Sequence, residues 1–221
     1  MFFQIAIDGP VGSGKSAIAK ELSNILGYTY IDTGAMFRAI ALYGVQNLLD
    51  FEYEEDFKNS FSKIYIEIKY DGIQKIFLNK KDVTNLIRTP EISLLASKIA
   101  NFASVRSFLL EIQQNLSKNR NIVMDGRDIA TFVLPNANLK IYLDASLEKR
   151  IERRMIDLKK MGNEIEYSVL KKQIIKRDYD DKNRKNSPLL IAKDAIVIDT
   201  TNMNLSQVLD YILKLIKDRR G

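Results

Sequence analysis

Residues 9–16, GPVGSGKS, lie between an apolar run, FFQIAID (2–8), and a helical pattern, AIAKELSNIL (17–26). They match the pattern Gly-x4-Gly-Lys-Ser/Thr, which ends here at Lys15 and Ser16. Glycines in such a loop let backbone N–H groups approach phosphate oxygens, and the lysine reaches the β- and γ-phosphates. The following helix points its positive end at the anion. An ordinary glycine-rich turn is the alternative, but the strand before the loop and the helix after it favour phosphate binding.

This loop predicts that the protein binds a nucleoside triphosphate such as ATP. The Ser16 hydroxyl is expected to face Mg²⁺, directly or through water. The motif leaves four fates open for the phosphate: transfer to a small molecule, transfer to a protein, loss to water, or no transfer. The residues expected to contact the triphosphate are Gly9, Pro10, Val11, Gly12, Ser13, Gly14, Lys15, Ser16 and Ala17.

The composition suits one α/β domain that carries an insertion. The chain has 221 residues, of which 46% are hydrophobic. No apolar run approaches the roughly 18 to 20 residues that span a bilayer, and the N-terminal stretch lacks the basic segment and cleavage site of a signal peptide. We therefore expect a cytoplasmic protein with no membrane partner. The net charge of +6 is compatible with nucleic-acid binding or with a site lined by arginines.

Two residue types are missing from the chain, and their absence restricts its chemistry. There is no cysteine, which excludes disulfides, thiolate nucleophiles and cysteine-based zinc sites. There is also no histidine, which removes the commonest general base and the commonest metal ligand. Phosphoryl transfer fits this restriction because it depends mainly on positioning and on charge neutralisation.

Five short apolar runs alternate with helical patterns along the chain. This order is typical of a P-loop α/β fold with a doubly wound, five-stranded parallel sheet flanked by helices. The predicted strands are 2–8, 28–32, 121–126, 139–145 and 195–200. The closing helix after 204 has one apolar stripe, and Asn204 and Gln207 resemble a capping box at its start.

A different pattern interrupts the series between the second and third predicted strands. Residues 63–70 and 73–79 alternate apolar and polar side chains on either side of Asp71-Gly72, which predicts an antiparallel hairpin with a short turn. We expect a small β subdomain at about 55–90, inserted into a core of about 1–54 and 90–221. Thr89-Pro90 then predicts the start of one long helix that runs to about Lys118.

Arginines follow two of the predicted strands. DTGAMFR (32–38) follows the second strand and MDGRD (124–128) follows the third. Both loops should lie at the carboxyl edge of the sheet beside the glycine loop, which would bring Arg38 and Arg127 together as a second anion site. A solvated helix position is the alternative for Arg38 alone.

Two later helical stretches carry further charges at helical spacing. Arg150 and Arg154 share one face, and Arg177, Asp181 and Arg184 share another. A charged helix is usually a solvated face. The break at Gly162-Asn163 nevertheless predicts a short lid at about 155–168 that would bring these cations to two phosphate-bearing ligands.

The arginine-rich, histidine-free pattern favours a phosphate as the acceptor. A hydroxyl acceptor commonly needs a base, whereas a phosphate monoester is already largely dianionic near neutral pH because its second pKa is about 6. Such an acceptor needs arginines that hold two anions in line. An aspartate could still serve as a base, so a hydroxyl acceptor stays open at this point.

Six segments together resemble the bacterial-type cytidylate kinases, a P-loop family that phosphorylates nucleoside monophosphates. In order they are IAIDGPVGSGKS, IDTGAMFRAIAL, IRTPEIS, VMDGRDIATFVLPNA, KIYLDAS and KRDYDDKNR, and they cover essentially the whole chain. The resemblance implies transfer of the ATP γ-phosphate to CMP or dCMP with Mg²⁺. It also implies that the inserted β subdomain binds the monophosphate.

The resemblance also implies roles for individual residues. Lys15, Arg127, Arg150 and Arg154 would act on the transferring phosphate, with the last two meeting the ATP phosphates as the lid closes. Arg38, Arg127 and Arg184 would hold the CMP phosphate, Ser97, Arg106 and Asp128 would read the cytosine edge, and Arg177 and Asp181 would hold the sugar hydroxyls. Thr33 and Phe37 stand where the family often has Ser and Tyr, and they are also expected to contact the substrate.

Two other functions compete with this interpretation. One is a kinase of the same architecture that acts on UMP, AMP or a hydroxyl acceptor. The other is a nucleotide-dependent RNA-binding protein, which the positive charge allows but which lacks a basic stripe interleaved with aromatic residues. We expect small-molecule substrates, no nucleic-acid partner and a monomer.

Overall fold

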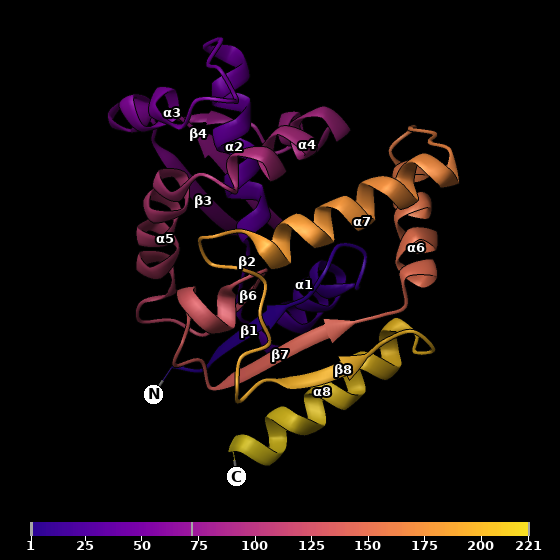
Figure 1. Cartoon of the computed structure of the whole chain (residues 1–221). Coiled ribbons are helices and arrows are strands. Elements are labelled where there is room, and N and C mark those ends of the chain that lie inside the picture. The colour runs from indigo at the N-terminus through magenta and orange to yellow at the C-terminus, as the bar shows by residue number, and fades with distance from the viewer. Residues whose placement is uncertain (1, 72, 221) are drawn as a thin grey trace.

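The computed structural model describes residues 2–71 and 73–220, and its centre is a five-stranded parallel sheet with helices on both faces (Figure 1). The strands are β1 (Gln4–Asp8), β2 (Thr29–Asp32), β6 (Ile122–Gly126), β7 (Leu139–Asp144) and β8 (Ile196–Asp199). They follow the order β2-β6-β1-β7-β8, and each neighbouring pair is parallel. The predicted doubly wound sheet is therefore confirmed.

One face of the sheet is covered by the first and last helices. α1 (Lys15–Leu26) ends at Gly27, which adopts a left-handed conformation that suits glycine. α8 (Leu205–Arg220) packs beside α1, and Ile18, Leu22 and Ile212 join the buried cluster over β1 and β7. The predicted capping box is present, because Asn204 and Gln207 exchange side-chain to backbone hydrogen bonds of 2.9 and 3.0 Å.

The opposite face is covered by α5 (Ala103–Ser117) and by the π-helical turn η3 (Ile129–Val133). The prediction of one long helix from Thr89 to about Lys118 is wrong, because the chain forms α4 (Pro90–Ile99) and α5 with a break between them. At the break Phe102 adopts an extended backbone conformation, and its ring packs on Phe57 with 5.8 Å between the ring centroids. The extended Phe102 is the N-cap of α5 and packs, partly buried, against the cluster that contains Phe57, so the two helices are separate.

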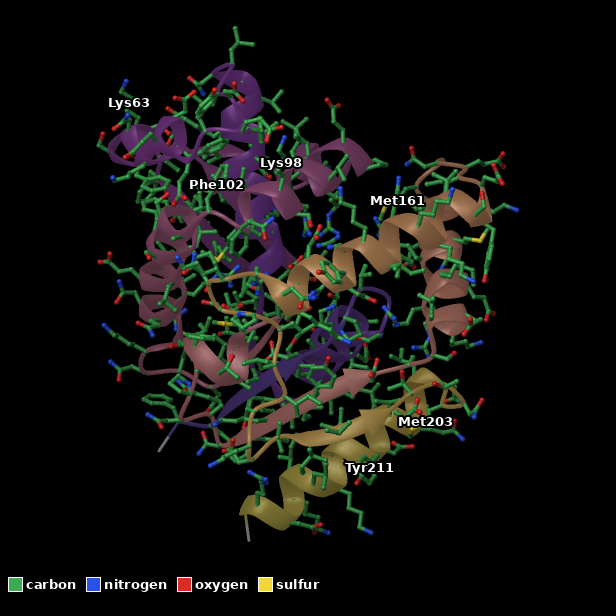
Figure 2. All side chains as sticks on the ribbon, in the orientation of Figure 1. Lys63, Lys98, Phe102, Met161, Met203 and Tyr211 are labelled. Atoms are coloured by element: carbon green, nitrogen blue, oxygen red, sulfur yellow. The ribbon has the colours of Figure 1, made fainter. Side chains whose placement is uncertain are left out.

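A second, antiparallel sheet lies at one end of the molecule, with strand order β3-β4-β5 (Figure 1). The predicted hairpin is confirmed as β3 (Ile66–Asp71) and β4 (Ile73–Leu78), whereas Gly72 of the predicted turn lies outside the described residues. The remaining elements of this end are α2 (Thr33–Gln46), α3 (Glu54–Ser60), η1 (Phe61–Lys63), β5 (Lys81–Asp82) and η2 (Leu86–Arg88). Figure 2 shows Lys63 and Phe102 at this end and Met203 and Tyr211 at the other.

Two charged helices complete the fold. α6 (Leu147–Lys160) and α7 (Tyr167–Asn183) form a helical hairpin with Gly162 in a left-handed conformation between them. α7 crosses the middle of the molecule between α6 and the end that holds the small sheet (Figure 1). Among residues 2–71 and 73–220, no helix combines the length and apolar character that crossing a membrane requires.

Candidate active site

A cavity of about 270 Å³ lies between the glycine loop, the carboxyl ends of β2 and β6, and α7. Most of the residues expected from the sequence line it, although they come from positions as far apart as Val11 and Arg184. The predicted residues on its wall are Val11, Gly12, Gly14, Lys15, Ser16, Ala17, Thr33, Phe37, Arg38, Ser97, Arg106, Arg127, Asp128, Arg154, Arg177, Asp181 and Arg184. The lining does not include four of the predicted residues, Gly9, Pro10, Ser13 and Arg150.

The glycine loop packs too tightly for side chains at two of its positions. A Cβ atom on Gly9 would lie 2.1 Å from the carbonyl oxygen of Leu143, and one on Gly12 would lie 2.6 Å from that of Arg150. Gly14 has a φ of +91° and is the N-cap of α1. The loop therefore presents its backbone at the positive end of α1, which is the arrangement that binds phosphate.

Ser16 forms a pair with Asp125, a residue that the sequence interpretation did not place in the site. The Ser16 hydroxyl donates to the Asp125 carboxylate at 2.6 Å, and Tyr30 donates to its other oxygen at 2.9 Å. Burial and the nearby Asp32 raise the pKa of Asp125 to about 6. An available signal was the position of this aspartate at the end of a strand beside the glycine loop, where P-loop proteins hold Mg²⁺.

Lys15 is buried in the free protein and donates from Nζ to the carbonyl oxygen of Pro10 at 3.1 Å. Burial, and then the charge of Arg127, lower the pKa of Lys15 to about 7. At pH 8 a large part of the lysine is therefore neutral before a ligand arrives. A triphosphate beside Nζ favours the charged form and raises this pKa again.

Binding of MgATP at pH 8 should therefore take up a proton. We expect a net uptake at pH 8 that becomes smaller as the pH falls toward 6, because Lys15 is then already charged and Asp125, whose pKa is raised to about 6, would lose its proton on binding Mg²⁺. Calorimetric titrations in buffers of different ionisation enthalpy measure this number. Lys20→Met, which removes an exposed lysine of the same helix, should keep the uptake. Proton release at pH 8, or an uptake independent of pH, would contradict the assignment to Lys15.

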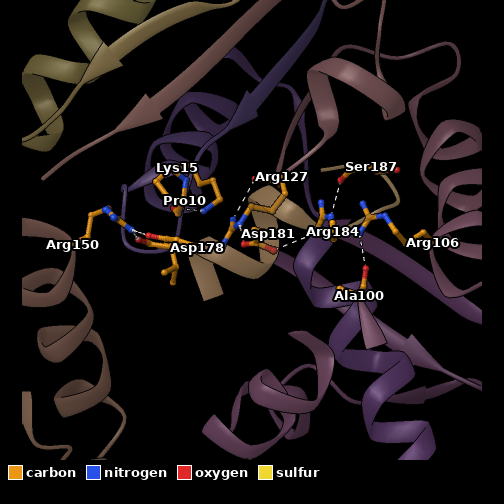
Figure 3. A network of polar contacts seen from close by, with 12 residues as sticks. Pro10, Lys15, Ala100, Arg106, Arg127, Arg150, Asp178, Asp181, Arg184 and Ser187 are labelled. Carbon is orange, nitrogen blue, oxygen red and sulfur yellow. Dashed lines mark hydrogen bonds and ion pairs between the residues drawn. The ribbon is translucent and has the colours of Figure 1, made fainter. Parts of the chain in front are cut away.

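Guanidinium groups and carboxylates form a row across the floor of the cavity (Figure 3). Arg127 donates from Nε to Asp181 at 2.7 Å, and Arg184 donates to the other oxygen of Asp181 at 3.1 Å. Arg184 also donates to the carbonyl oxygen of Ser187 at 2.7 Å. Asp181 thus holds two arginines in fixed orientations around one carboxylate, which is the charge pattern that binds an anion.

Arg177 of α7 also lines the cavity, and its buried Nε has no hydrogen-bond partner among residues 2–71 and 73–220. Burial and the neighbouring Arg127 lower the pKa of Arg177 to about 10, so the side chain is still charged near neutral pH. A buried, charged donor without a partner is costly unless a ligand completes it. Arg177 is therefore directed at an acceptor that the protein itself does not supply.

Another part of the cavity wall contains an aromatic ring, that of Phe37. Arg106 and Asp128 are buried and form an ion pair, and Arg106 also donates to the carbonyl oxygen of Ala100 at 3.1 Å. The guanidinium carbon of Arg106 lies 5.4 Å from the centre of the Phe37 ring. Ser97 of α4 also lines the cavity. Donors, acceptors and a ring face are the groups that recognise a nucleobase.

Arg150 takes a different position from the one expected from helical spacing. Its guanidinium forms an ion pair with Asp178 of α7 and donates to the carbonyl oxygens of Val11 and Ala145, each at 3.1 Å. In this conformation it ties α6 and α7 to the glycine loop from behind, whereas Arg154 lines the cavity. Asp178 was not identified from the sequence, since one aspartate on a charged helix carries no distinguishing signal.

The strand order, the glycine loop and the Ser16–Asp125 pair define the class of P-loop kinases. A solved shikimate kinase from Acinetobacter baumannii has the same fold, with a TM-score of 0.50 at 14% identity, covering 99% of this chain and 94% of that one. The family model described as cytidylate kinase matches residues 5–218. The chain belongs to the cytidylate kinase family, a family of phosphotransferases.

Curated relatives of that name match over nearly their whole length. A cytidylate kinase from Caldicellulosiruptor bescii is 46% identical over 212 residues, which cover 96% of this chain and 94% of the relative. One from Thermotoga maritima is 43% identical over 221 residues, with 99% of each chain covered.

Proposed function

We propose that the protein transfers the γ-phosphoryl group of ATP to CMP or dCMP, giving ADP and CDP or dCDP. The observation that carries this proposal is the row of arginines between the glycine loop and the Arg106–Asp128 pair (Figure 3). Such a row neutralises two phosphate-bearing ligands that face each other, and the Arg106–Asp128 pair beside the Phe37 ring suits a nucleobase. Membership of the cytidylate kinase family supports cytosine as that base.

The triphosphate half of the site also suits Mg²⁺. This ion prefers oxygen ligands and is usually bound by one or two carboxylates together with substrate phosphates. The Ser16 hydroxyl and the Asp125 carboxylate, which are 2.6 Å apart, are a donor set of this kind beside the loop. When bound, Mg²⁺ would neutralise charge on the β- and γ-phosphates. Lys15 would leave Pro10 and contact the same phosphates.

The monophosphate half would be held by the cations on the other side of the transferring group. Arg38, Arg127 and Arg184 would bind the CMP phosphate, with Thr33 beside them. Arg177 and Asp181 would hold the sugar hydroxyls, since a carboxylate accepts hydrogen bonds from a diol. Phe37 would pack on the cytosine while Ser97, Arg106 and Asp128 contact its polar edge.

No general base is required for this reaction. An oxygen of the CMP phosphate, already deprotonated near neutral pH, forms a bond to the γ-phosphorus as the bond from that phosphorus to the β-phosphate oxygen breaks. The new diphosphate remains with the cytidine and ADP leaves. The arginines hold the two anions together. They also stabilise the negative charge that, in the transition state, is spread over the attacking CMP phosphate, the transferring phosphoryl group and the β-phosphate of ATP.

Two segments would close around the substrates. The lid at about 155–168 contains the α6–α7 turn, and closure of the lid would bring Arg154 to the ATP phosphates. Arg150 could reach the same phosphates if its ion pair with Asp178 breaks. The insert at about 55–90 would cover CMP. Closure of this kind excludes water, so that ATP is not hydrolysed. The proposal also covers the partners and the location of the protein. All the residues assigned to the two substrates belong to one chain, which supports a monomer. No nucleic acid is part of the proposed reaction, and ATP and CMP as substrates support a location in the cytoplasm.

Product analysis with several acceptors tests this function. Purified protein is supplied with Mg²⁺, ATP and one of CMP, dCMP, UMP or AMP, and both ADP and the new diphosphate are measured. We expect CDP and dCDP to form many times faster than UDP or the ADP that would arise from AMP. Preferred phosphorylation of UMP or AMP, with CMP nearly inert, would assign the site to another monophosphate.

Asp128 should control the choice between CMP and UMP. Its carboxylate can accept a hydrogen bond from the cytosine amino group, whereas uracil presents a carbonyl oxygen that a carboxylate repels. We expect Asp128→Ala to lower the ratio of kcat/KM for CMP to that for UMP by at least about tenfold, the effect of losing one charged hydrogen bond. Asp210→Ala, an exposed aspartate on α8, serves as the control. An unchanged ratio in Asp128→Ala would exclude this role.

A further inference from the structure

The outer edge of β2 is covered by a side chain and not by a strand. β2 is the last strand of the parallel sheet on its side, and its other edge pairs with β6. At the open edge lies the β3–β4 hairpin of the small sheet. Its buried Gln74 accepts a hydrogen bond from the backbone N–H of Asp32 at 2.7 Å, and its amide group donates weakly to the Asp32 carbonyl oxygen at 3.5 Å.

The side-chain amide of Gln74 therefore replaces the peptide group of a missing neighbouring strand. A backbone N–H at an open edge, once buried, needs an acceptor, and the loss of that acceptor is costly. A second contact from the same hairpin reaches α1, where the Tyr70 hydroxyl donates to Asn24 at 2.9 Å. The Tyr70 hydroxyl also lies 3.3 Å from that of Ser23. Among the hydrogen bonds from the described residues of the hairpin to β2 and α1, only those of Gln74 reach a residue of the site.

Asp32 connects this contact to the arginines. Its carboxylate accepts from the backbone N–H of Ala35 at 3.0 Å as the N-cap of α2, and it forms an ion pair with Arg38 at 2.7 Å. Burial alone would raise the pKa of Asp32. The charge of Arg38 and the hydrogen bond from the Ala35 N–H outweigh burial, so this pKa lies below its usual value. Space is tight here, since a Cβ atom on Gly34 would lie 3.1 Å from Asp32 and 3.2 Å from Arg38.

We propose that Gln74 is a positioning residue for the acceptor phosphate: by holding the Asp32 backbone, the inserted hairpin fixes the orientation of Arg38. Gln74 itself does not line the cavity. The inference rests on the proposed function, because it assigns Arg38 to the CMP side of the site. It also gives the insert a task besides covering CMP, namely to hold the edge of the core sheet from which Arg38 extends.

The test replaces Gln74 by methionine, which has similar length but cannot form these hydrogen bonds. We expect Gln74→Met to raise the KM for CMP by about tenfold, the effect of about 1.4 kcal/mol, while the KM for ATP changes less than about twofold. Tyr70→Phe is the matched control, because it removes a contact of the same hairpin without affecting Asp32. It should leave both KM values unchanged.

A double-variant cycle separates positioning from general loss of stability. If Gln74 acts through Arg38, the double variant Gln74→Met/Arg38→Met should have nearly the same KM for CMP as Arg38→Met alone. The effects of the two substitutions should therefore not sum. A Gln74→Met protein that melts earlier but binds CMP normally, or effects that simply add, would overturn the inference. The wild-type protein is measured in the same assay. If it turns over CMP, either of these two results rules out the role of Gln74 and leaves the proposed function standing.

Discussion

Lys15→Met should lower kcat for CDP formation by at least about 10²-fold, as expected when a main stabiliser of transition-state charge is lost. Methionine keeps most of the buried stem and removes only the charged end, which donates to Pro10 in the free protein. The effect should appear in kcat more than in the KM for CMP, because Lys15 lies on the triphosphate side of the cavity. Steady-state rates with saturating ATP and CMP measure it.

The control for this substitution is Lys20→Met, which removes an exposed lysine from the same helix and should retain nearly full activity. Thermal melting of both variants shows whether they remain folded. Near-normal turnover by folded Lys15→Met protein would show that the glycine loop does not carry the reacting phosphates.

Arg127→Met should lower kcat/KM for CMP by about 10³-fold or more, the range seen when an arginine that neutralises a transferring phosphoryl group is removed. Arg127 follows β6 at the carboxyl edge of the sheet, and its pairing with Asp181 links it to α7. Burial alone would lower the pKa of Arg127. The charge of Asp181 outweighs burial, so this pKa lies above its usual value and the guanidinium group stays protonated.

Separate measurement of kcat and KM shows whether Arg127 stabilises the transition state or only the bound substrate. A role in the transition state predicts that kcat falls strongly, with a smaller rise in the KM for CMP. A higher KM with unchanged kcat would instead mean that Arg127 only binds the substrate. The matched control is Arg120→Met, which removes an exposed arginine and should have little effect.

The glycine loop and the sheet could be predicted from the sequence because their signals are local. The pattern around Gly9–Ser16 places a strand, a loop and a helix within 26 residues, and each element appears where it was expected. The alternation on both sides of residue 72 likewise predicts β3 and β4 without knowledge of the rest of the chain. Arg38 and Arg127 followed from one further step, that loops after parallel strands meet at one edge. Helical spacing indicated Arg154, Arg177 and Arg184, whereas Arg106 followed only from the resemblance to a known family.

The parts that could not be predicted depend on contacts between distant positions. Gln74 meets Asp32 across 42 residues, and no local pattern indicates this pair. Asp125 is 109 residues from Ser16, and its position at the end of a predicted strand was the one signal for it. At the break before α5, Phe102 packs against Phe57 of α3, which is 45 residues earlier in the chain. The ion pair of Arg150 with Asp178 depends on how α6 and α7 cross, which helical spacing alone does not specify.

The central claim is that arginines bring two phosphate groups together without a base, and a comparison of CMP with cytidine as acceptors tests it most directly. The two differ only in the phosphate, and cytidine offers a hydroxyl that must lose a proton before it can attack. With Mg²⁺ and ATP, we expect rapid formation of CDP from CMP, and neither CMP nor CDP detectable when cytidine is the acceptor. ³¹P NMR follows both reactions. Phosphorylation of cytidine at a rate comparable to that of CMP would contradict the claim.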